Sequence, residues 1–273
     1  VLMVPDASSP AAVRDALANR SSRWLSPRPI AAGKALDDVA QQVAHSRESW
    51  SGRFLFKEEE SDPERRGLRP PQAGALHAAM AHWSVSTQPG TIVMPTGTGK
   101  TETMLGLLVG QTINKLLVIV PTDALRSQVG DKFLRLGVLK EAGCLADGIE
   151  LPVVAMLGSI PKTMTEVDAI FDHANVVVTT MQIAGNASAE CQARMAERAS
   201  HLFVDEAHHI GARTWNAFRS QFAKRRILQF TATPFRSDGR SIGGKFIYVY
   251  PLRKAQEHGL FRPITYLPVQ GLN

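Results

Sequence analysis

Short apolar runs alternate with longer amphipathic stretches from residue 68 onward. The runs are rich in β-branched residues, Leu or Phe, and most are apolar throughout, at residues 91–94, 116–120, 153–157, 176–179, 202–204 and 227–230. Continuous apolar runs are typical of strands covered on both faces, so the pattern predicts a mainly parallel sheet between two helix layers. The stretches 100–113, 124–136 and 215–223 are long enough for crossover helices. The predicted fold class is therefore α/β, doubly wound.

The first 67 residues have a different pattern. Helices are expected at residues 11–20, where Ser9 and Pro10 supply an N-cap and a first-turn proline, and at about 34–45. The charged segment 58–67 follows and is expected to be a linker or surface loop. We therefore predict a small N-terminal helical extension, partly linker, over residues 1–67 and a second unit over 68–273.

Composition narrows the class of protein. The chain has 273 residues, of which 44% are hydrophobic and 21% are charged, and this supports a packed core. It contains no apolar stretch of about 18 residues, its start at Val1 has only four apolar residues, and its two cysteines cannot form a disulfide framework. These observations predict a cytoplasmic or nucleoid-associated protein that is neither secreted nor bound to a membrane.

The positive charge is unevenly distributed. The net charge is +6, yet residues 212–273 alone hold 11 basic and 2 acidic side chains, including the run Lys224, Arg225 and Arg226. Such an excess is what a polyphosphate partner would favour, and it is equally typical of a solvated surface. The sequence leaves both interpretations open.

A glycine-rich turn follows the predicted strand 91–94. Gly97 and Gly99 allow successive N–H groups to point at phosphate oxygens, and the helix that follows adds its dipole. Lys100 could then reach the terminal phosphates, and the Thr101 hydroxyl could ligate Mg²⁺. The usual pattern has glycine where this chain has Met94, so the match is incomplete at its first position. Strand before and helix after nevertheless predict nucleotide binding.

Two carboxylates follow the predicted strand 202–204. Asp205 is placed to hold a nucleotide-bound Mg²⁺, and Glu206 is a candidate for polarising an attacking water. The strand 227–230 ends in hydroxyl residues, Thr231 and Thr233, which could hydrogen-bond to a neighbouring loop.

Together these segments resemble the first RecA-like motor domain of superfamily 2 DEAD/DEAH-box helicases, most of all the restriction-enzyme (ResIII-type) branch. The carrying motifs are residues 94–101, the DEAH box at 205–208 and Thr-Ala-Thr at 231–233, with weaker support in the expected order from 68–72, 120–128 and 177–182. The resemblance covers about residues 68–270 and implies a RecA-like P-loop fold.

By this resemblance the domain is expected to bind ATP with Mg²⁺ and to hydrolyse it while holding nucleic acid, with DNA favoured over RNA. Lys100 and Glu206 would be catalytic, and Thr101 with Asp205 would hold the metal. The implied nucleotide-binding residues are Arg69, Gln72, Pro95, Thr96, Gly97, Thr98, Gly99, Lys100 and Thr101, with Gln72 recognising the base. His208, Thr231 and Thr233 would couple hydrolysis to strand movement. The implied nucleic-acid contacts are Pro121, Thr122, Arg126, Thr179 and Gln182, for which helix capping at Thr122 is the structural alternative.

Family members have a second RecA-like domain that completes the ATP site, and we expect it to be absent from this chain and present in a full-length protein. The isolated chain should then be weakly active or inactive. Three alternatives remain open: a restriction motor that translocates on duplex DNA without separating strands, a different P-loop enzyme such as a nucleotide kinase, and a non-catalytic nucleotide-gated binding module. The last would predict loss of Lys100 or Glu206, and both are present.

Overall fold

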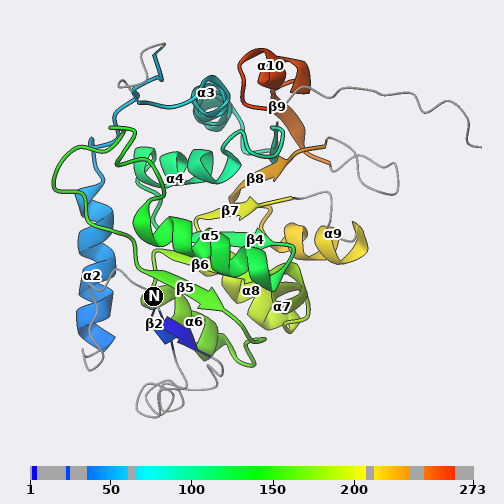
Figure 1. Ribbon diagram of the computed structural model, residues 1–273. Coiled ribbons are helices and arrows are strands. Elements are labelled where there is room, and N and C mark those ends of the chain that lie inside the picture. Colours follow the sequence, from blue (N-terminus) through cyan, green and yellow to red (C-terminus); the bar gives the residue numbers. More distant parts are fainter. Residues whose placement is uncertain are drawn as a thin grey trace, which may run out of the picture.

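The fold is built on one nine-stranded sheet with helices on both faces (Figure 1). The computed structural model describes residues 2–4, 23–24, 36–60, 66–206, 212–233 and 243–261. The strand order is β2-β1-β5-β6-β4-β7-β8-β3-β9, and every neighbouring pair is parallel except β1 with β2. The strands are β1 (Leu2–Val4), β2 (Arg23–Trp24), β3 (Gly90–Val93), β4 (Leu116–Val120), β5 (Val154–Leu157), β6 (Val176–Thr180), β7 (His201–Val204), β8 (Arg226–Thr231) and β9 (Lys245–Val249).

The helices form two layers, each with its own hydrophobic core. One core joins a sheet face to α3 (Pro70–Val85), α4 (Lys100–Gly110) and α5 (Asp123–Arg135). The other joins the opposite face to α6 (Met164–Asp172), α7 (Met181–Gly185), α8 (Ala189–Arg198) and α9 (Ala212–Gln221). The central strands β4, β6 and β7 are buried along their whole length, as their continuous apolar sequences require. Within the described residues, no helix is long and apolar enough to cross a membrane.

The predicted α/β class is confirmed, and all six predicted strands are present with shifts of one residue at some ends. The strands β1, β2 and β9 were not predicted. The last of these, β9, lies at the sheet edge beside β3, and its side chains are mostly exposed or half-buried. A short helix, α10 (Leu252–Glu257), follows it. The edge position explains why β9 lacks the continuous apolar pattern of the buried strands.

The N-terminal region contacts the sheet domain closely. The helix α2 (Leu36–Ser49) corresponds to the predicted helix 34–45, whereas the predicted helix 11–20 lies outside the described residues. Asn175 donates a hydrogen bond from its amide to the carbonyl of Val43 at 2.8 Å, and Ser46 donates to the Leu151 carbonyl at 2.9 Å. Trp50 is fully buried in the core of the α3–α5 face. The domain boundary at residue 67 stays a prediction.

The segment after α2 crosses the α4 helix and runs toward the carboxyl edge of the sheet. Phe54 packs against Gly106 and Gly110, where an added Cβ would lie 3.2 Å from its ring. Glu58 and Leu68 form a parallel β-bridge, and the Glu59 N–H donates to the Leu68 carbonyl at 2.8 Å. Parts of the charged segment expected to be a linker therefore have fixed positions beside α3.

One buried histidine makes stability depend on pH. Burial lowers the pKa of His201, at the start of β7, to about 4, with a smaller contribution from Arg226. Because the unfolded chain takes up this proton near pH 6.5, the free energy of unfolding should fall as the pH drops from 6.5 to 4, by up to about 3 kcal/mol. Replacing His201 by Phe keeps the aromatic packing against Trp83, whose ring centroid lies 5.1 Å away, and removes the titration.

Urea unfolding at pH 7 and pH 4.5 checks this expectation. The loss of stability between the two pH values should be smaller in His201→Phe than in the wild type. The same substitution at exposed His77 controls for losing a histidine. An equal pH dependence in wild type and His201→Phe would assign the effect to other groups.

Candidate nucleotide-binding site

The carboxyl ends of three adjacent strands bring the sequence motifs together. Within the order β7-β8-β3, the backbone N–H of Met94 donates to the carbonyl of Thr231 at 2.9 Å, which joins the glycine-rich turn to the end of β8. The Asp205 N–H donates to the Ile119 carbonyl at 2.8 Å, so the acidic motif is fixed to β4. A cavity of about 750 Å³ opens at this edge. Carboxyl strand ends are where open α/β sheets bind ligands.

The glycine-rich turn has the backbone that a phosphate-binding loop requires. Gly97 and Gly99 have φ of +84° and +97°, in the left-handed region that favours glycine. A Cβ on Gly97 would meet no atom within 4 Å, so this part of the loop faces open space. A Cβ on Gly99 would lie 2.0 Å from the side-chain amide nitrogen of Gln72. Glycine is therefore required at position 99 by both the backbone and its neighbour.

Gln72 also fixes the start of α3. Its side-chain oxygen accepts a hydrogen bond from the Arg69 N–H at 2.8 Å, and the residue is 6% exposed. The Arg69 guanidinium donates to the Gly97 carbonyl at 3.4 Å. These contacts connect the start of α3 to the glycine-rich turn.

The remaining turn residues divide into structural and exposed positions. Thr98 is buried and donates from its hydroxyl to the Pro95 carbonyl at 2.6 Å, which closes the turn internally. Thr96 is exposed at the cavity, and Thr101 lines it from the first turn of α4. Pro95 and Thr98 do not line the cavity.

The two predicted catalytic residues form an ion pair. The Lys100 ammonium lies 2.8 Å from Oε1 of Glu206, and the two side chains are only 9% and 17% exposed. Glu206 has a φ of +49°, an unusual value for a residue that is not glycine. Such backbone strain is concentrated at functional sites, because it holds a side chain in a direction that a relaxed backbone would not give.

Asp205 is buried beside this pair, and its surroundings suit a divalent cation. Burial first and the neighbouring Glu206 second raise the pKa of the Asp205 carboxyl to about 6, although Lys100 acts in the opposite direction. Two adjacent carboxylates thus face one ammonium inside a largely buried site. Together with the Thr101 hydroxyl they offer the oxygen ligands that Mg²⁺ prefers, so the residues present fit the ion.

The structure describes two of the three predicted coupling residues, Thr231 and Thr233. Thr231 is buried at the end of β8, where its hydroxyl donates to the Thr233 carbonyl at 2.7 Å and accepts from the Thr233 N–H at 3.2 Å. This tight turn adjoins the glycine-rich loop through the Met94 hydrogen bond. His208 lies outside the described residues.

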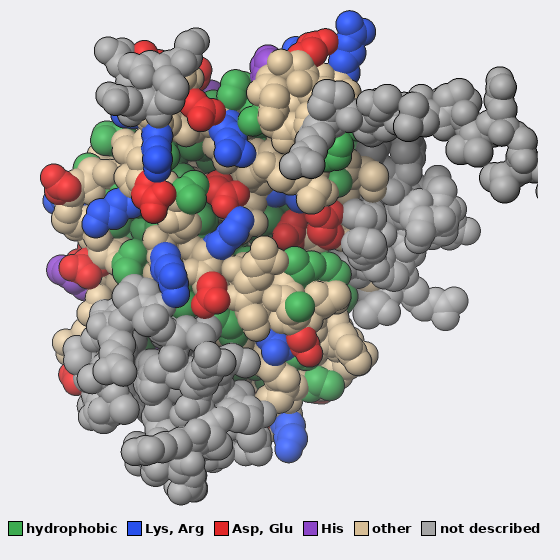
Figure 2. All heavy atoms as spheres, in the orientation of Figure 1, with side chains coloured by type: hydrophobic (Ala, Val, Ile, Leu, Met, Phe, Trp, Pro, Cys, Tyr) green, Lys and Arg blue, Asp and Glu red, His purple; other side chains and the backbone are tan. Residues whose placement is uncertain are grey.

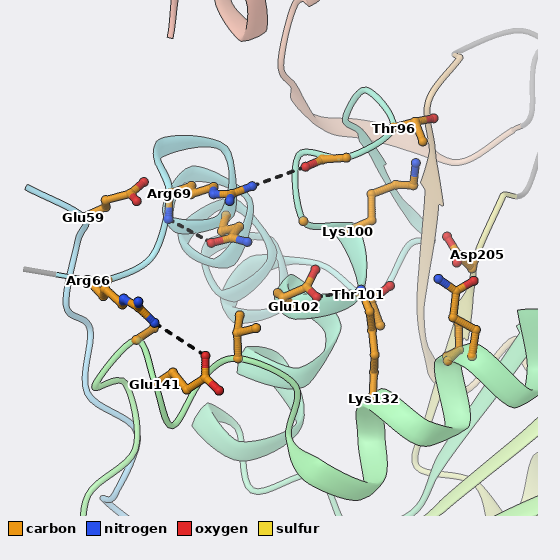
Figure 3. Close-up of a pocket in the computed structure, with 18 of the residues that line it drawn as sticks. Glu59, Arg66, Arg69, Thr96, Lys100, Thr101, Glu102, Lys132, Glu141 and Asp205 are labelled. Atoms are coloured by element: carbon orange, nitrogen blue, oxygen red, sulfur yellow. Dashed lines mark hydrogen bonds and ion pairs between the residues drawn. The ribbon is translucent and has the colours of Figure 1, made fainter. Parts of the chain in front are cut away.

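Figure 3 shows that the cavity extends well beyond the sequence motifs. Its outer wall includes Glu59, Arg66 and Gly67 from the charged segment before α3, and Glu141 from the turn after α5. Arg66 and Glu141 form an exposed ion pair of 3.6 Å across the mouth. Sequence reasoning missed these residues because no motif marks them. The β-bridge between Glu58 and Leu68 and the Arg66–Glu141 ion pair hold the charged segment at the cavity.

The predicted nucleic-acid contacts gather at a second place on the same sheet edge. Arg126 is buried, and its guanidinium donates to the Asp123 carboxylate at 2.7 Å and to the Leu157 carbonyl at 3.3 Å. Thr179 is fully buried and donates to the same carbonyl at 3.2 Å. Thr122 is exposed, and its hydroxyl accepts a hydrogen bond from the Leu125 N–H. It therefore caps α5, which is the alternative role that the sequence left open for it.

The exposed members of this set are Thr122 and Gln182, with Pro121 half-buried. They follow the adjacent strands β4 and β6, whereas none of them lines the nucleotide cavity. The basic run 224–226 lies at the opposite edge of the sheet, where β8 begins with Arg226. Arg225 there donates to the carbonyls of Ala196 and Glu197, and Arg226 stacks 5.5 Å from the Trp83 ring. Two of the three basic side chains in the run therefore contact the protein itself.

Comparison with solved structures finds several nucleic-acid enzymes at low identity. The UvsW helicase of bacteriophage T4 is 15% identical with a TM-score of 0.46, over 86% of this chain and 74% of UvsW. The restriction-modification enzyme LlaBIII, bound to DNA, is 18% identical with a TM-score of 0.49, over 71% of this chain and 16% of its own. The Hef helicase domain of Pyrococcus furiosus is 22% identical with a TM-score of 0.39, over 59% of this chain and 33% of its own. No curated protein matches the chain.

Family membership comes from a sequence match. The family model for the res subunit of type III restriction enzymes matches residues 65–236, more than half of the chain. The match includes the glycine-rich turn and the acidic motif, which line the cavity, and the hydroxyl turn, which is hydrogen-bonded to Met94 beside them. The chain belongs to this ResIII family.

Proposed function

We propose that this domain binds and hydrolyses ATP with Mg²⁺ and uses the energy to move along nucleic acid, with DNA as the expected partner. The observation that carries the proposal is the meeting of Lys100, Asp205 and Glu206 with the glycine-rich turn at one cavity. A triphosphate has room beside Gly97, and its charge would be opposed by the Lys100 ammonium. Lys100 and Glu206 are the proposed catalytic residues.

The ion pair gives these two residues an ordered role. A nucleotide that enters must draw the Lys100 ammonium toward its phosphates, because that ammonium is the buried cation nearest the turn. Glu206, released from Lys100, can then accept a hydrogen bond from a water molecule and polarise it for attack. Thr101 and Asp205 would hold Mg²⁺, which supplies charge neutralisation of the phosphate oxygens when bound.

The coupling proposal rests on the backbone connection between Met94 and Thr231. A change at the phosphate loop has a direct route to the end of β8, because the two segments share a hydrogen bond of 2.9 Å. The turn of Thr231 and Thr233 adjoins this bond and is the proposed path from the nucleotide to the rest of the domain. DNA translocation without strand separation, as in restriction motors, is the alternative form of the same activity.

The proposed nucleic-acid surface is the carboxyl edge near Thr122 and Gln182. Arg126 and Thr179 are proposed to support it from beneath, since both bind the Leu157 carbonyl and are buried. On the face drawn in Figure 2, the described Lys and Arg side chains are interspersed with Asp and Glu. This face therefore has no continuous basic patch among the described residues that would compete with the motif edge for nucleic acid.

Matched substitutions at the two sheet edges test this placement. Changing exposed Gln182 to Glu adds a negative charge beside the proposed phosphate contacts, and changing exposed Gln221 to Glu adds the same charge beside the basic run. We expect Gln182→Glu to weaken oligonucleotide binding about fivefold, from roughly 1 kcal/mol of repulsion at contact distance in water. Gln221→Glu should leave the affinity unchanged.

Fluorescence anisotropy across a salt series measures both effects. The wild-type affinity should fall with salt, with a log–log slope of roughly 0.7–0.9 for each phosphate contacted. The difference caused by Gln182→Glu should shrink at high salt because the repulsion is screened. A loss confined to Gln221→Glu would place the contact surface at the basic run and contradict the proposal.

A further inference from the structure

A second lysine lies on the wall of the nucleotide cavity. Lys132 projects from α5 and forms an ion pair of 2.7 Å with Glu102, which lies in the first turn of α4 directly after Thr101. The Glu102 side chain is 12% exposed and that of Lys132 is 37% exposed. Both residues line the cavity. Figure 3 shows the Lys132 side chain reaching from α5 to a point beside Thr101.

The Lys132 ammonium has hydrogen-bond donors that its ion pair does not use. Within the described part of the chain, Glu102 is the one hydrogen-bond partner of the Lys132 ammonium, and it occupies one of three N–H donors. Lys100 is paired with Glu206, and Arg66 lies at the mouth with Glu141. Lys132 is thus a cation inside the cavity with two donors left for a ligand.

The charge of the cavity indicates what that ligand would be. The described lining carries five acidic and four basic side chains: Glu59, Glu102, Glu141, Asp205 and Glu206 against Arg66, Arg69, Lys100 and Lys132. A polyphosphate adds further negative charge to a wall that has no excess of positive charge. Of the cations at the glycine-rich turn, Lys100 already pairs with Glu206 and Arg69 already donates to the Gly97 carbonyl. A second ammonium beside the glycine-rich turn relieves this shortage.

We propose that Lys132 is a second phosphate-binding cation of the nucleotide site, supplied by α5 and held in position by Glu102. The inference rests on the proposed nucleotide-binding function and assigns a residue to it that no motif marks. Lys132 donates to a phosphate oxygen through its free N–H groups while its contact with Glu102 keeps the flexible side chain at the cavity wall. It is a binding residue and takes no part in polarising water.

Calorimetric titration with MgATP, MgADP and adenosine tests the proposal at constant ionic strength. Replacing Lys132 by Met keeps the length of the side chain and removes the charge. We expect MgATP affinity to fall about tenfold or more, as for loss of a hydrogen bond to a charged group. The loss for MgADP should be equal or smaller, and adenosine binding should not change. Lys224→Met, at the exposed opposite edge of the sheet, is the matched control.

The variant Glu102→Gln and the double variant Lys132→Met/Glu102→Gln separate phosphate binding from simple screening. If Lys132 binds phosphate, the double variant binds MgATP as weakly as Lys132→Met does. Wild-type affinity in the double variant would show that Lys132 only neutralises Glu102, which would overturn the proposal. Equal MgATP affinity of the wild type and Lys132→Met, or an equal loss for adenosine, would also overturn it.

The outcomes also distinguish this inference from the proposed function. If the wild type binds no MgATP, nucleotide binding itself fails. If the wild type binds MgATP and loses it in Lys100→Met but not in Lys132→Met, only the role of Lys132 is wrong. Thermal unfolding of each variant confirms that it is folded before titration.

Discussion

Replacing Lys100 by Met should reduce the affinity for MgATP about 100-fold, which corresponds to about 2.7 kcal/mol. The Lys100 ammonium is the buried cation at the glycine-rich turn, and its removal leaves the phosphates facing Asp205 and Glu206. The same change should also lower the free energy of unfolding, by about 3 kcal/mol, because a largely buried ion pair loses its cation. Calorimetry and urea unfolding measure the two effects separately.

A double variant separates the two roles of Lys100. In Lys100→Met/Glu206→Gln the neutral amide no longer needs the ammonium, so most of the lost stability should return. Nucleotide affinity should remain low, because the cation that opposes the phosphates is still missing. Recovery of MgATP binding in the double variant would show that Lys100 serves only to balance Glu206, and the assignment of the phosphate loop would then be wrong.

Changing Glu206 to Gln should preserve MgATP binding and lower the rate of hydrolysis about 10²–10⁴-fold, the usual contribution of a general base. The amide has nearly the same shape as the carboxylate but cannot accept the proton of water. Affinity could even rise, because Lys100 is released from its ion pair of 2.8 Å. Single-turnover hydrolysis with protein in excess over ATP, with and without DNA, measures the rate.

Asp205→Asn is the matched control for this result. It removes a charge from the adjacent position, but we expect it to weaken the Mg²⁺-dependent part of nucleotide binding rather than hydrolysis alone. Comparing titrations of ATP with and without Mg²⁺ isolates that part. If both variants lose MgATP binding to the same extent, the division of labour between the two carboxylates fails.

The proposed nucleotide site and the proposed nucleic-acid surface occupy different strand ends of one sheet edge. The first lies at β3, β8 and β7, and the second at β4 and β6, with β4 and β7 as direct neighbours. The Asp205 N–H, bonded to the Ile119 carbonyl of β4, connects the two regions through backbone. Since α5 is capped by Thr122 at its start and carries Lys132, it contributes to both surfaces.

The sequence by itself determined the fold class and the core of the site. Buried parallel strands must be apolar on both faces, so β4, β6 and β7 could be located from their runs alone. The chemistry of the phosphate loop depends on residues adjacent in the chain, Gly97 to Thr101, and the acidic pair is likewise contiguous. Such motifs can be recognised in the sequence because the residues that act together are adjacent in the chain.

Only the tertiary structure decided which distant residues complete the cavity and which candidates are buried. An edge strand such as β9 and the charged segment around Glu59 carry no periodic apolar signal, since their places depend on partners far along the chain. The sequence predicts Arg126 to be a nucleic-acid contact. In the structure its side chain is buried and donates hydrogen bonds to Asp123 and to the Leu157 carbonyl. Lys132 and Glu102 meet across 30 residues because α4 and α5 pack side by side. Pairing between helices is set by packing, and a single helix sequence does not specify it.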